Sequence, residues 1–210
     1  MVMPGLGVRT EDVAALQTLL ESHALLRREQ EFKLSSGRQS KYYFNAKPVT
    51  LSAEGLELVG RTMGPFALRV GADAVGGLEI GAIPIALAIA AWSRQAATEI
   101  PAFIVRDAQK RHGTEELIAE SYLWGEPRNS RVVIVDDVVT TGKSVQQAID
   151  AVVGNGCEVL SVVTLVTRPE EGGVGEMRRR FSENYISIFE CDMEGNLNPL
   201  INEFVAAPTA

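Results

Sequence analysis

The segment from Val132 to Ser144 combines residue types that bind phosphate and sugar groups. An apolar run delivers two adjacent carboxylates, Asp136 and Asp137, to its end. A turn of small hydroxyl residues and glycine, Thr140 to Gly142, then leads into an expected helix. Backbone N–H groups at such a turn, together with the helix dipole, form a cradle for a phosphate monoester. The neighbouring carboxylates suit ribose hydroxyls, a Mg²⁺ ion or a developing positive charge.

Two better-known nucleotide motifs do not fit this chain. Gly142-Lys143-Ser144 matches the end of a P-loop, but a P-loop needs a glycine five residues before its second glycine, where this sequence has Asp137. The stretch Gly76 to Gly81 has Leu78 at the third position, so it lacks the glycine spacing of a dinucleotide-binding turn. The phosphate cradle is therefore of another kind.

The elements around this segment alternate between strands and helices. Apolar strands without polar alternation, separated by amphipathic helices, predict an α/β fold with a parallel sheet and helices on both faces. Ligands of such sheets bind beyond the carboxyl ends of the strands. Ser52 and Thr10 are expected to cap two earlier helices. The predicted strands are 74–77, 102–106, 131–135, 158–166 and 185–189, with a strand-like stretch at 30–45, and the predicted later helices are 84–97, 144–153 and 176–183.

Composition limits the classes of protein that this chain can belong to. Its 210 residues, 46% hydrophobic and 22% charged, are enough for one domain with a full core, and disorder is excluded. The net charge of −7 argues against nonspecific binding to nucleic acid or to an anionic membrane. Cys157 and Cys191 have neither a disulfide framework nor a zinc spacing around them, so we expect reduced core thiols and a cytoplasmic protein. The start of the chain lacks the pattern of a signal peptide.

The carboxylate-and-glycine segment resembles the phosphoribosyl pyrophosphate signature of type I phosphoribosyltransferases, and other segments narrow the resemblance to orotate phosphoribosyltransferases. Residues 32–43 resemble that family's base-binding hairpin, 77–86 its pyrophosphate loop, and 106–113 its catalytic loop. Residues 167–173 resemble the segment whose arginine contacts orotate. The similarity runs in the family's order from about residue 10 to about residue 205, so it covers nearly the whole chain.

The resemblance implies a single domain over residues 1–210, with a small N-terminal base-binding hood formed by about residues 1–48 and the C-terminal part of the chain. It implies transfer of ribose 5-phosphate from phosphoribosyl pyrophosphate to orotate in pyrimidine biosynthesis, with Mg²⁺ carried mainly by substrate and water, near Asp136 and Asp137. It also implies a homodimer whose catalytic loop reaches the other subunit. The implied catalytic residues are Lys110, Asp136 and Asp137, and the implied substrate-binding residues are Arg106, His112, Thr140, Thr141, Gly142, Lys143, Ser144, Arg168, Phe32, Tyr42 and Tyr43.

The sequence departs from the family pattern at three places. Many members have a lysine where this chain has Ser35, and another directly after the loop arginine, where this chain has Asp107. Some have a basic pair in place of Glu79-Ile80. These changes remove positive charge near an anionic substrate, so we expect them to affect the tightness of binding and not the type of reaction.

Two alternatives stay open at this point. The same chemistry could act on another base, such as a purine. The chain could instead be a regulator that senses phosphoribosyl pyrophosphate without catalysis, although its acidic charge and lack of spare length argue against a nucleic-acid-binding role. Several single residues also have ordinary explanations: Arg106 alone fits a solvated strand end, and one of Tyr42 and Tyr43 is expected in the core because they alternate along a strand.

Overall fold

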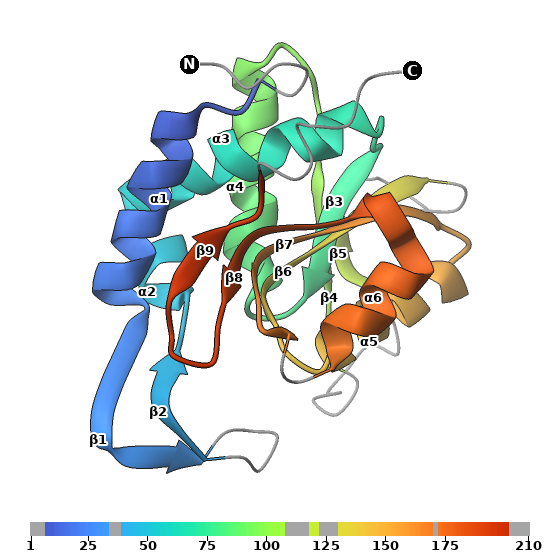
Figure 1. Cartoon of the computed structure of the whole chain (residues 1–210). Helices are drawn as coiled ribbons and strands as arrows, with labels where there is room; N and C mark the ends of the chain where they lie inside the picture. Colours follow the sequence, from blue (N-terminus) through green and yellow to red (C-terminus); the bar gives the residue numbers. More distant parts are fainter. Residues whose placement is uncertain (1–6, 34–38, 108–117, 122–129, 170–171, 202–210) are drawn as a thin grey trace.

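A central sheet carries the strands that the sequence predicts. The computed structural model of the chain describes residues 7–33, 39–107, 118–121, 130–169 and 172–201, with only the backbone described at 27–33, 39–41 and 118–121. The sheet has seven strands in the order β5-β4-β3-β6-β7-β8-β9 (Figure 1). The five inner strands run parallel to one another. The two edge strands, β5 and β9, each run antiparallel to their neighbour. The strands are β3 (Ala74–Leu78), β4 (Ala102–Val105), β5 (Ile118–Ser121), β6 (Arg131–Val139), β7 (Glu158–Thr167), β8 (Tyr185–Cys191) and β9 (Leu197–Pro199).

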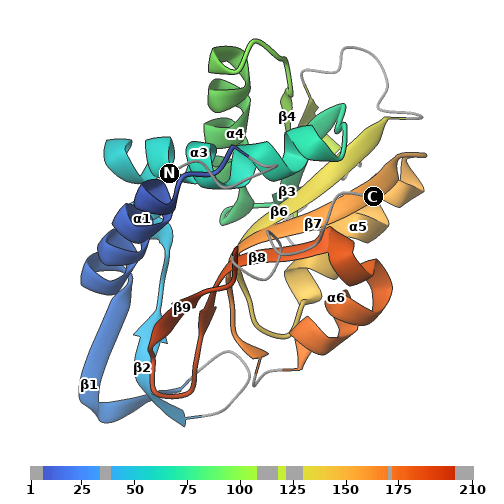
Figure 2. The same ribbon diagram turned by 45° about the horizontal axis from the view of Figure 1, so that its top comes forward.

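Helices cover both faces of this sheet. In Figure 2 the helices α1, α3 and α4 lie on one side of the strands and α5 and α6 on the other. Alternate residues of β6 feed two separate cores: Val133 and Val135 pack on the α3–α4 side, and Val132 and Ile134 on the α5 side. The helices are α1 (Thr10–His23), α2 (Lys47–Thr50), α3 (Ala53–Arg69), α4 (Ala82–Gln95), α5 (Lys143–Gly154) and α6 (Gly173–Phe181), the last followed by a 3-10 turn at Ser182–Asn184.

The N-termini of α1 and α3 test the two helix caps that the sequence predicts. Ser52 caps α3, since its Oγ accepts the Gly55 N–H at 3.0 Å, as expected from the sequence. The expected cap at Thr10 is wrong: α1 begins at Thr10 itself, and its N-cap position is Arg9, which makes no side-chain capping bond. The helix is nevertheless held in place by Val13, Leu16 and Leu20, which are buried in the core.

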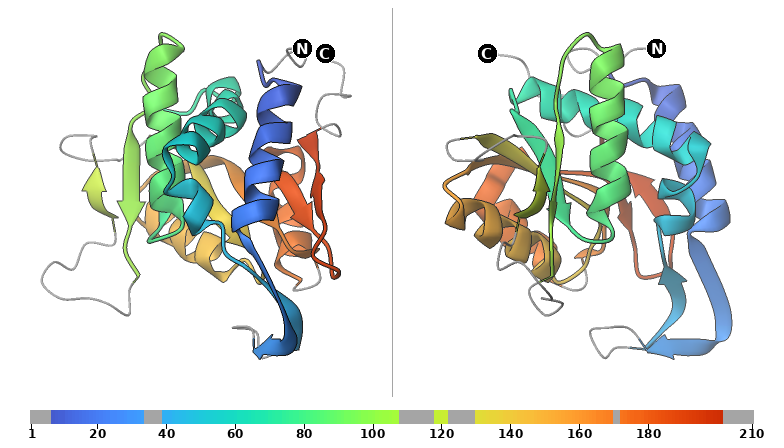
Figure 3. Two further views of the ribbon diagram at one scale, coloured as in Figure 1. Left: turned by 90° about the vertical axis from the view of Figure 1, so that its left-hand side faces the viewer. Right: turned by 180° about the vertical axis from the view of Figure 1, so that it is seen from behind.

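A two-stranded hairpin lies apart from the sheet. Strands β1 (Leu25–Lys33) and β2 (Gln39–Phe44) pair antiparallel and extend beyond the main body (Figures 1 and 3). Near its base the Tyr42 hydroxyl donates to the Asp192 carbonyl at 2.6 Å, in the turn between β8 and β9. From α1, Gln17 Nε2 donates to the Leu197 carbonyl at 2.8 Å. The N-terminal segment therefore contacts the C-terminal strands, while the division of the chain into one domain with a hood stays a prediction.

Strand β6 differs from expectation in a way that matters for the site. The sequence predicts that it ends at Val135, whereas it continues to Val139 because its backbone pairs with β7 as far as Val139 and Thr167. Asp136 and Asp137 thus lie within the strand instead of after it. The short elements α2, β5 and β9 were not predicted, since three or four residues are too few to show a hydrophobic period. No helix among the described residues is long and apolar enough to cross a membrane.

Candidate active site

Four loops that carry the predicted residues meet at one edge of the sheet. Strands β3, β4, β6 and β7 are parallel, so the segments that follow them emerge side by side. The Asp107 N–H donates to Glu79 Oε1 at 3.1 Å, which joins the loop after β4 to the loop after β3. The Arg168 N–H donates to the Val139 carbonyl at 2.9 Å, which joins the ends of β7 and β6. These two bonds join the four loops in neighbouring pairs.

The turn after β6 has the geometry expected of an anion cradle. Gly142 has φ of +76°, which favours glycine, and it forms the N-cap of α5. The side chains of Thr141, Lys143 and Ser144 are exposed, whereas Gly142 is buried. Gly173 packs so closely behind the turn that a Cβ there would lie 2.2 Å from the Thr141 carbonyl carbon. The turn is thus fixed from behind, and its N-terminal helix donors lie at the edge of the sheet.

Asp136 is buried on the α5–α6 side of the sheet. One of its oxygens, Oδ1, accepts the N–H of Asp137 at 3.0 Å. Burial, and then the adjacent negative charge of Asp137, raise the pKa of Asp136 well above its ordinary value. The phenol of Tyr185 lies on the same side and donates to Thr167 Oγ1 at 3.2 Å. A carboxyl group in this environment favours its protonated form.

Asp137 has its partners on the other side of the sheet. Its Oδ1 accepts the Val138 N–H at 2.9 Å, and its Oδ2 forms an ion pair with Lys47 Nζ at 3.0 Å. The loop after β3 also approaches closely, because a Cβ on Gly81 would lie only 2.3 Å from Asp137 Oδ1. The two predicted catalytic carboxylates therefore have different environments. Sequence reasoning missed Lys47, which lies 90 residues from its partner; its place directly after a predicted strand was the only local signal.

Arg168 and Tyr42 form a second buried group. Arg168 is 5% exposed and Tyr42 is 4% exposed. Nη2 of Arg168 donates to the Tyr42 hydroxyl at 3.0 Å, and the guanidinium carbon lies 4.8 Å from the centre of the Tyr42 ring. Tyr43, the next residue, is 42% exposed, which confirms that one of the two tyrosines is a core residue. An aromatic side chain of the hairpin thus holds the guanidinium of Arg168 in place.

The structure describes the other predicted site residues only in part. Arg106 is exposed at the end of β4, beside the loop after β3. Phe32 lies in β1, where only the backbone is described, and Lys110 and His112 lie outside the described residues. Their roles stay predictions, as do the substrate contacts of all the residues named above.

The oxygen donors at this edge fit a metal ion that arrives with its substrate. Among the described residues, no three His, Cys, Asp or Glu side chains lie together as a metal site. Asp137 offers carboxylate oxygens at this edge, with Asp136 adjacent to it, and Mg²⁺ is typically held by one or two carboxylates plus substrate phosphates and water.

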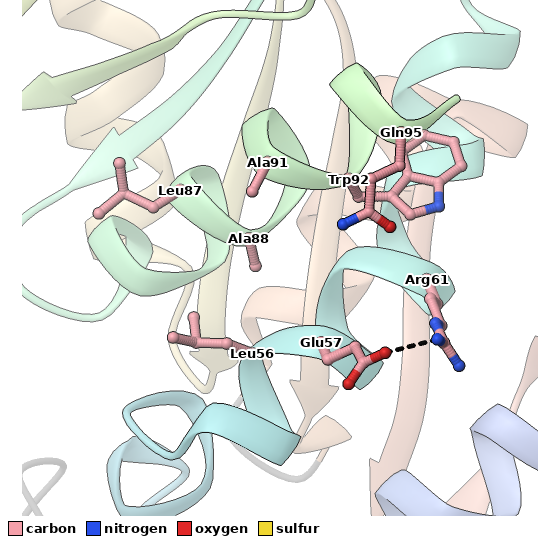
Figure 4. A pocket seen from close by; sticks show the side chains of 8 residues that line it. All are labelled: Leu56, Glu57, Arg61, Leu87, Ala88, Ala91, Trp92 and Gln95. Carbon is pink, nitrogen blue, oxygen red and sulfur yellow. Dashed lines mark hydrogen bonds and ion pairs between the residues drawn. The ribbon is translucent and has the colours of Figure 1, made fainter. Parts of the chain in front are cut away.

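A separate groove lies between α3 and α4 (Figure 4). None of the predicted site residues lines it. Its lining residues are Leu56, Glu57, Arg61, Leu87, Ala88, Ala91, Trp92 and Gln95.

Comparisons with known proteins place the chain in a family. The sequence profile of the phosphoribosyl transferase domain matches residues 69–193, which is more than half of the chain. An orotate phosphoribosyltransferase of Aquifex aeolicus is 43% identical over 145 residues, covering 69% of this chain and 76% of the relative. The chain belongs to the orotate phosphoribosyltransferase family. The predicted membership of this family is thereby confirmed. The profile spans the predicted segments 77–86, 106–113, 132–144 and 167–173, whereas 32–43 lies before it, and the role of each segment stays a prediction.

Solved structures agree with this assignment. The orotate phosphoribosyltransferase of Mycobacterium tuberculosis is 30% identical, with a TM-score of 0.66 over 85% of this chain and 96% of that one. The same enzyme in complex with 5-phospho-alpha-D-ribosyl 1-diphosphate gives a TM-score of 0.65 at 27% identity, over 87% and 90% of the two chains. The predicted fold, a mostly parallel sheet covered on both faces, is confirmed.

Proposed function

We propose that the protein transfers the 5-phosphoribosyl group from phosphoribosyl pyrophosphate to orotate. The products are orotidine 5'-monophosphate and pyrophosphate, which makes this a step of pyrimidine biosynthesis. The observation that carries the proposal is the carboxylate pair Asp136 and Asp137 next to the Gly142 turn, at the ligand-binding edge of the sheet, in a chain of this family.

The reaction needs positioning and charge stabilisation more than covalent chemistry by the protein. Positive charge develops on the sugar and negative charge on the departing pyrophosphate, so fixed groups of opposite sign lower the barrier. The backbone donors of residues 140–144 hold the 5-phosphate. Asp137 faces the ribose hydroxyls, and Asp136 behind it fixes the Asp137 backbone through the bond to its N–H.

Mg²⁺ is the metal that we propose for this site. It would neutralise charge on the pyrophosphate and the ribose oxygens when it enters with the substrate. The carboxylate of Asp137 would lie nearest to it, with Asp136 directly behind. The exposed Arg106 adds a cationic donor on the side where pyrophosphate would leave.

Arg168 recognises the base in this proposal. A guanidinium offers a planar pair of donors that matches the carboxylate of orotate, and the Tyr42 contact keeps this group from turning freely. Uracil lacks the carboxylate and would leave the buried arginine without its anionic partner. We therefore expect turnover with orotate and, in the better cases, about 10⁴-fold less with uracil.

A single assay separates this function from its alternatives. Purified protein with Mg²⁺ and phosphoribosyl pyrophosphate is tested in parallel against orotate, uracil and purine bases, with release of pyrophosphate as the measurement. Equal rates with both pyrimidines would remove the role given to Arg168. A preference for a purine would indicate a related transferase, and binding of phosphoribosyl pyrophosphate without turnover of any base would indicate a regulator.

We also propose a homodimer with a shared active site, on the strength of the family resemblance of residues 106–113. Lys110 of one subunit would act at the Asp137 of the other, and Lys110→Ala would cost about 10²–10³ in turnover. Mixing Lys110→Ala protein with Asp137→Asn protein tests this. Sharing would give each mixed dimer one intact site, and random exchange of equal amounts would restore roughly a quarter of wild-type activity. No recovery despite demonstrated exchange of subunits would reject the sharing.

We place the enzyme in the cytoplasm. Buried thiols at Cys157 and Cys191 are consistent with a reducing compartment.

A further inference from the structure

Lys47 reaches the active-site edge from outside the sheet. It is the first residue of α2, the helix that follows the hairpin strand β2 in the sequence. Its Nζ lies 3.0 Å from Asp137 Oδ2. The side chain of Lys47 is 41% exposed, whereas that of Asp137 is 11% exposed. Lys47 thus pairs with a largely buried carboxylate while part of its own side chain stays exposed to solvent.

The backbone beneath Lys47 is firmly held. Its N–H donates to Asn45 Oδ1 at 3.2 Å, and its carbonyl accepts the Leu51 N–H at 2.9 Å. The next turn is anchored by Val49 and Thr50, both of which are buried. The backbone from which the flexible Lys47 side chain extends is therefore fixed. Less conformational freedom is then lost when Nζ of Lys47 pairs with Asp137.

Three segments of the chain contact the carboxylate of Asp137 and orient it. The Val138 N–H binds one oxygen, Lys47 binds the other, and the backbone at Gly81 packs against the carboxylate. Without the lysine, Oδ2 would lose its ion-pair partner beside a second carboxyl group, that of Asp136. Removing one partner of an ion pair leaves the other charge, here the largely buried carboxylate of Asp137, without compensation.

Several acidic side chains lie at this edge of the sheet, so the positive charge of Lys47 matters for binding an anionic substrate. The loops after β3 and β4 bring Glu79 and Asp107 to the same edge as the two aspartates. A substrate with several phosphate groups would meet this negative charge. A cation held at Asp137 offsets part of it without occupying the phosphate cradle at Gly142.

We propose that Lys47 is a positioning residue of the active site, which holds the Asp137 carboxylate in the orientation that binds the ribose of phosphoribosyl pyrophosphate. This role rests on the proposed function. Lys47 acts through Asp137, so it differs from a lysine that binds substrate by itself.

A double-mutant cycle tests this dependence. Lys47→Met is made in the wild-type protein and in the Asp137→Asn variant, and kcat/KM for phosphoribosyl pyrophosphate is measured with orotate saturating. We expect Lys47→Met to lower kcat/KM by about 10-fold to 100-fold, the loss seen when a group that orients a functional ligand is removed. In the Asp137→Asn background the same change should cost less than about 3-fold, because the partner is already absent. Lys47→Arg should recover part of the activity.

Arg61 provides a matched control. Its Nη1 pairs with Asp12 Oδ1 at 3.4 Å, with side-chain exposures of 41% and 10% that nearly equal those of the Lys47 pair, and its Nη2 also pairs with Glu57 on the same helix (Figure 4). Arg61→Met removes both pairs, so it should lower the melting temperature at least as much as Lys47→Met and leave kcat/KM within about twofold of wild type. An equal loss of activity in both variants would mean that losing any such ion pair is enough, which would overturn the proposal.

Other outcomes are equally decisive. Unchanged activity of Lys47→Met, or an equal loss in both backgrounds, would overturn the proposal, while the wild-type assay with orotate tests the proposed function separately. If Lys47→Met does not fold, Lys47→Gln takes its place in the same cycle, because its amide can still occupy the site. Circular dichroism and melting temperature establish folding for every variant.

Discussion

Replacing Tyr42 by phenylalanine would remove a single oxygen that connects three segments of the chain. The Tyr42 hydroxyl accepts a hydrogen bond from Arg168 Nη2 at 3.0 Å and donates one to the Asp192 carbonyl at 2.6 Å. The ring itself would remain, with the guanidinium of Arg168 on its face and Gly195 packed against its edge atoms. Tyr42→Phe therefore tests the hydroxyl separately from the aromatic contact.

The cost can be worked from these two bonds. A hydrogen bond from a charged donor contributes about 1.5–3 kcal/mol and a neutral one about 0.5–1.5 kcal/mol, so we expect a loss of about 3 kcal/mol in the free energy of unfolding. For a chain of this size each kcal/mol lowers the melting temperature by about 2–4 °C. The expected decrease is thus about 6–12 °C.

The same change should weaken orotate binding. A guanidinium that has lost its anchor must be ordered again when the substrate binds, at about 0.5–1.5 kcal/mol for a long side chain. That cost corresponds to an increase in the KM for orotate of about 2-fold to 13-fold. The KM for phosphoribosyl pyrophosphate should change much less, because Arg168 is assigned to the base.

Thermal unfolding followed by circular dichroism, and initial rates at varied orotate, measure both effects. Tyr43→Phe is the stability control: its side chain is 42% exposed, so its melting temperature should move by no more than about 2 °C. A Tyr42→Phe protein with wild-type melting temperature and wild-type KM for orotate would refute the reasoning.

Two further predictions concern the buried carboxyl group of Asp136 and the proposed metal ion. The pKa of Asp136 is raised in the folded protein, so the native state binds more protons than the unfolded state and stability falls as pH rises above the ordinary carboxyl range toward that raised pKa. Asp136→Asn should therefore melt higher than wild type by a margin that grows from pH 5 to pH 8, although its turnover falls; a constant margin would contradict burial as the cause. Chelation of divalent ions should abolish turnover and leave the melting temperature unchanged, and a large drop in melting temperature on chelation alone would show a structural metal instead.

The chain's sequence by itself determined the kind of fold and the place of the Gly142 turn. The apolar run 132–135 and the mostly apolar stretch 162–166 are local patterns, and a strand buried on both faces needs such patterns wherever it lies in the sheet. Ser52 capped its helix as expected, because the bond to Gly55 spans only three residues. The glycine at position 142 marked the start of α5 for the same reason, since its positive φ is a property of one residue.

The tertiary structure decided which groups meet at that turn. Lys47 and Asp137 are 90 residues apart, and Tyr42 and Arg168 are 126 residues apart. Neither pair has a periodic signature, because each depends on where the hairpin leaves the first helix and on the order of strands in the sheet. The different environments of Asp136 and Asp137 arose because β6 continues past Val135, which depends on its pairing with β7. Pairing of this kind is a property of two segments together, so one segment's residues could not reveal it.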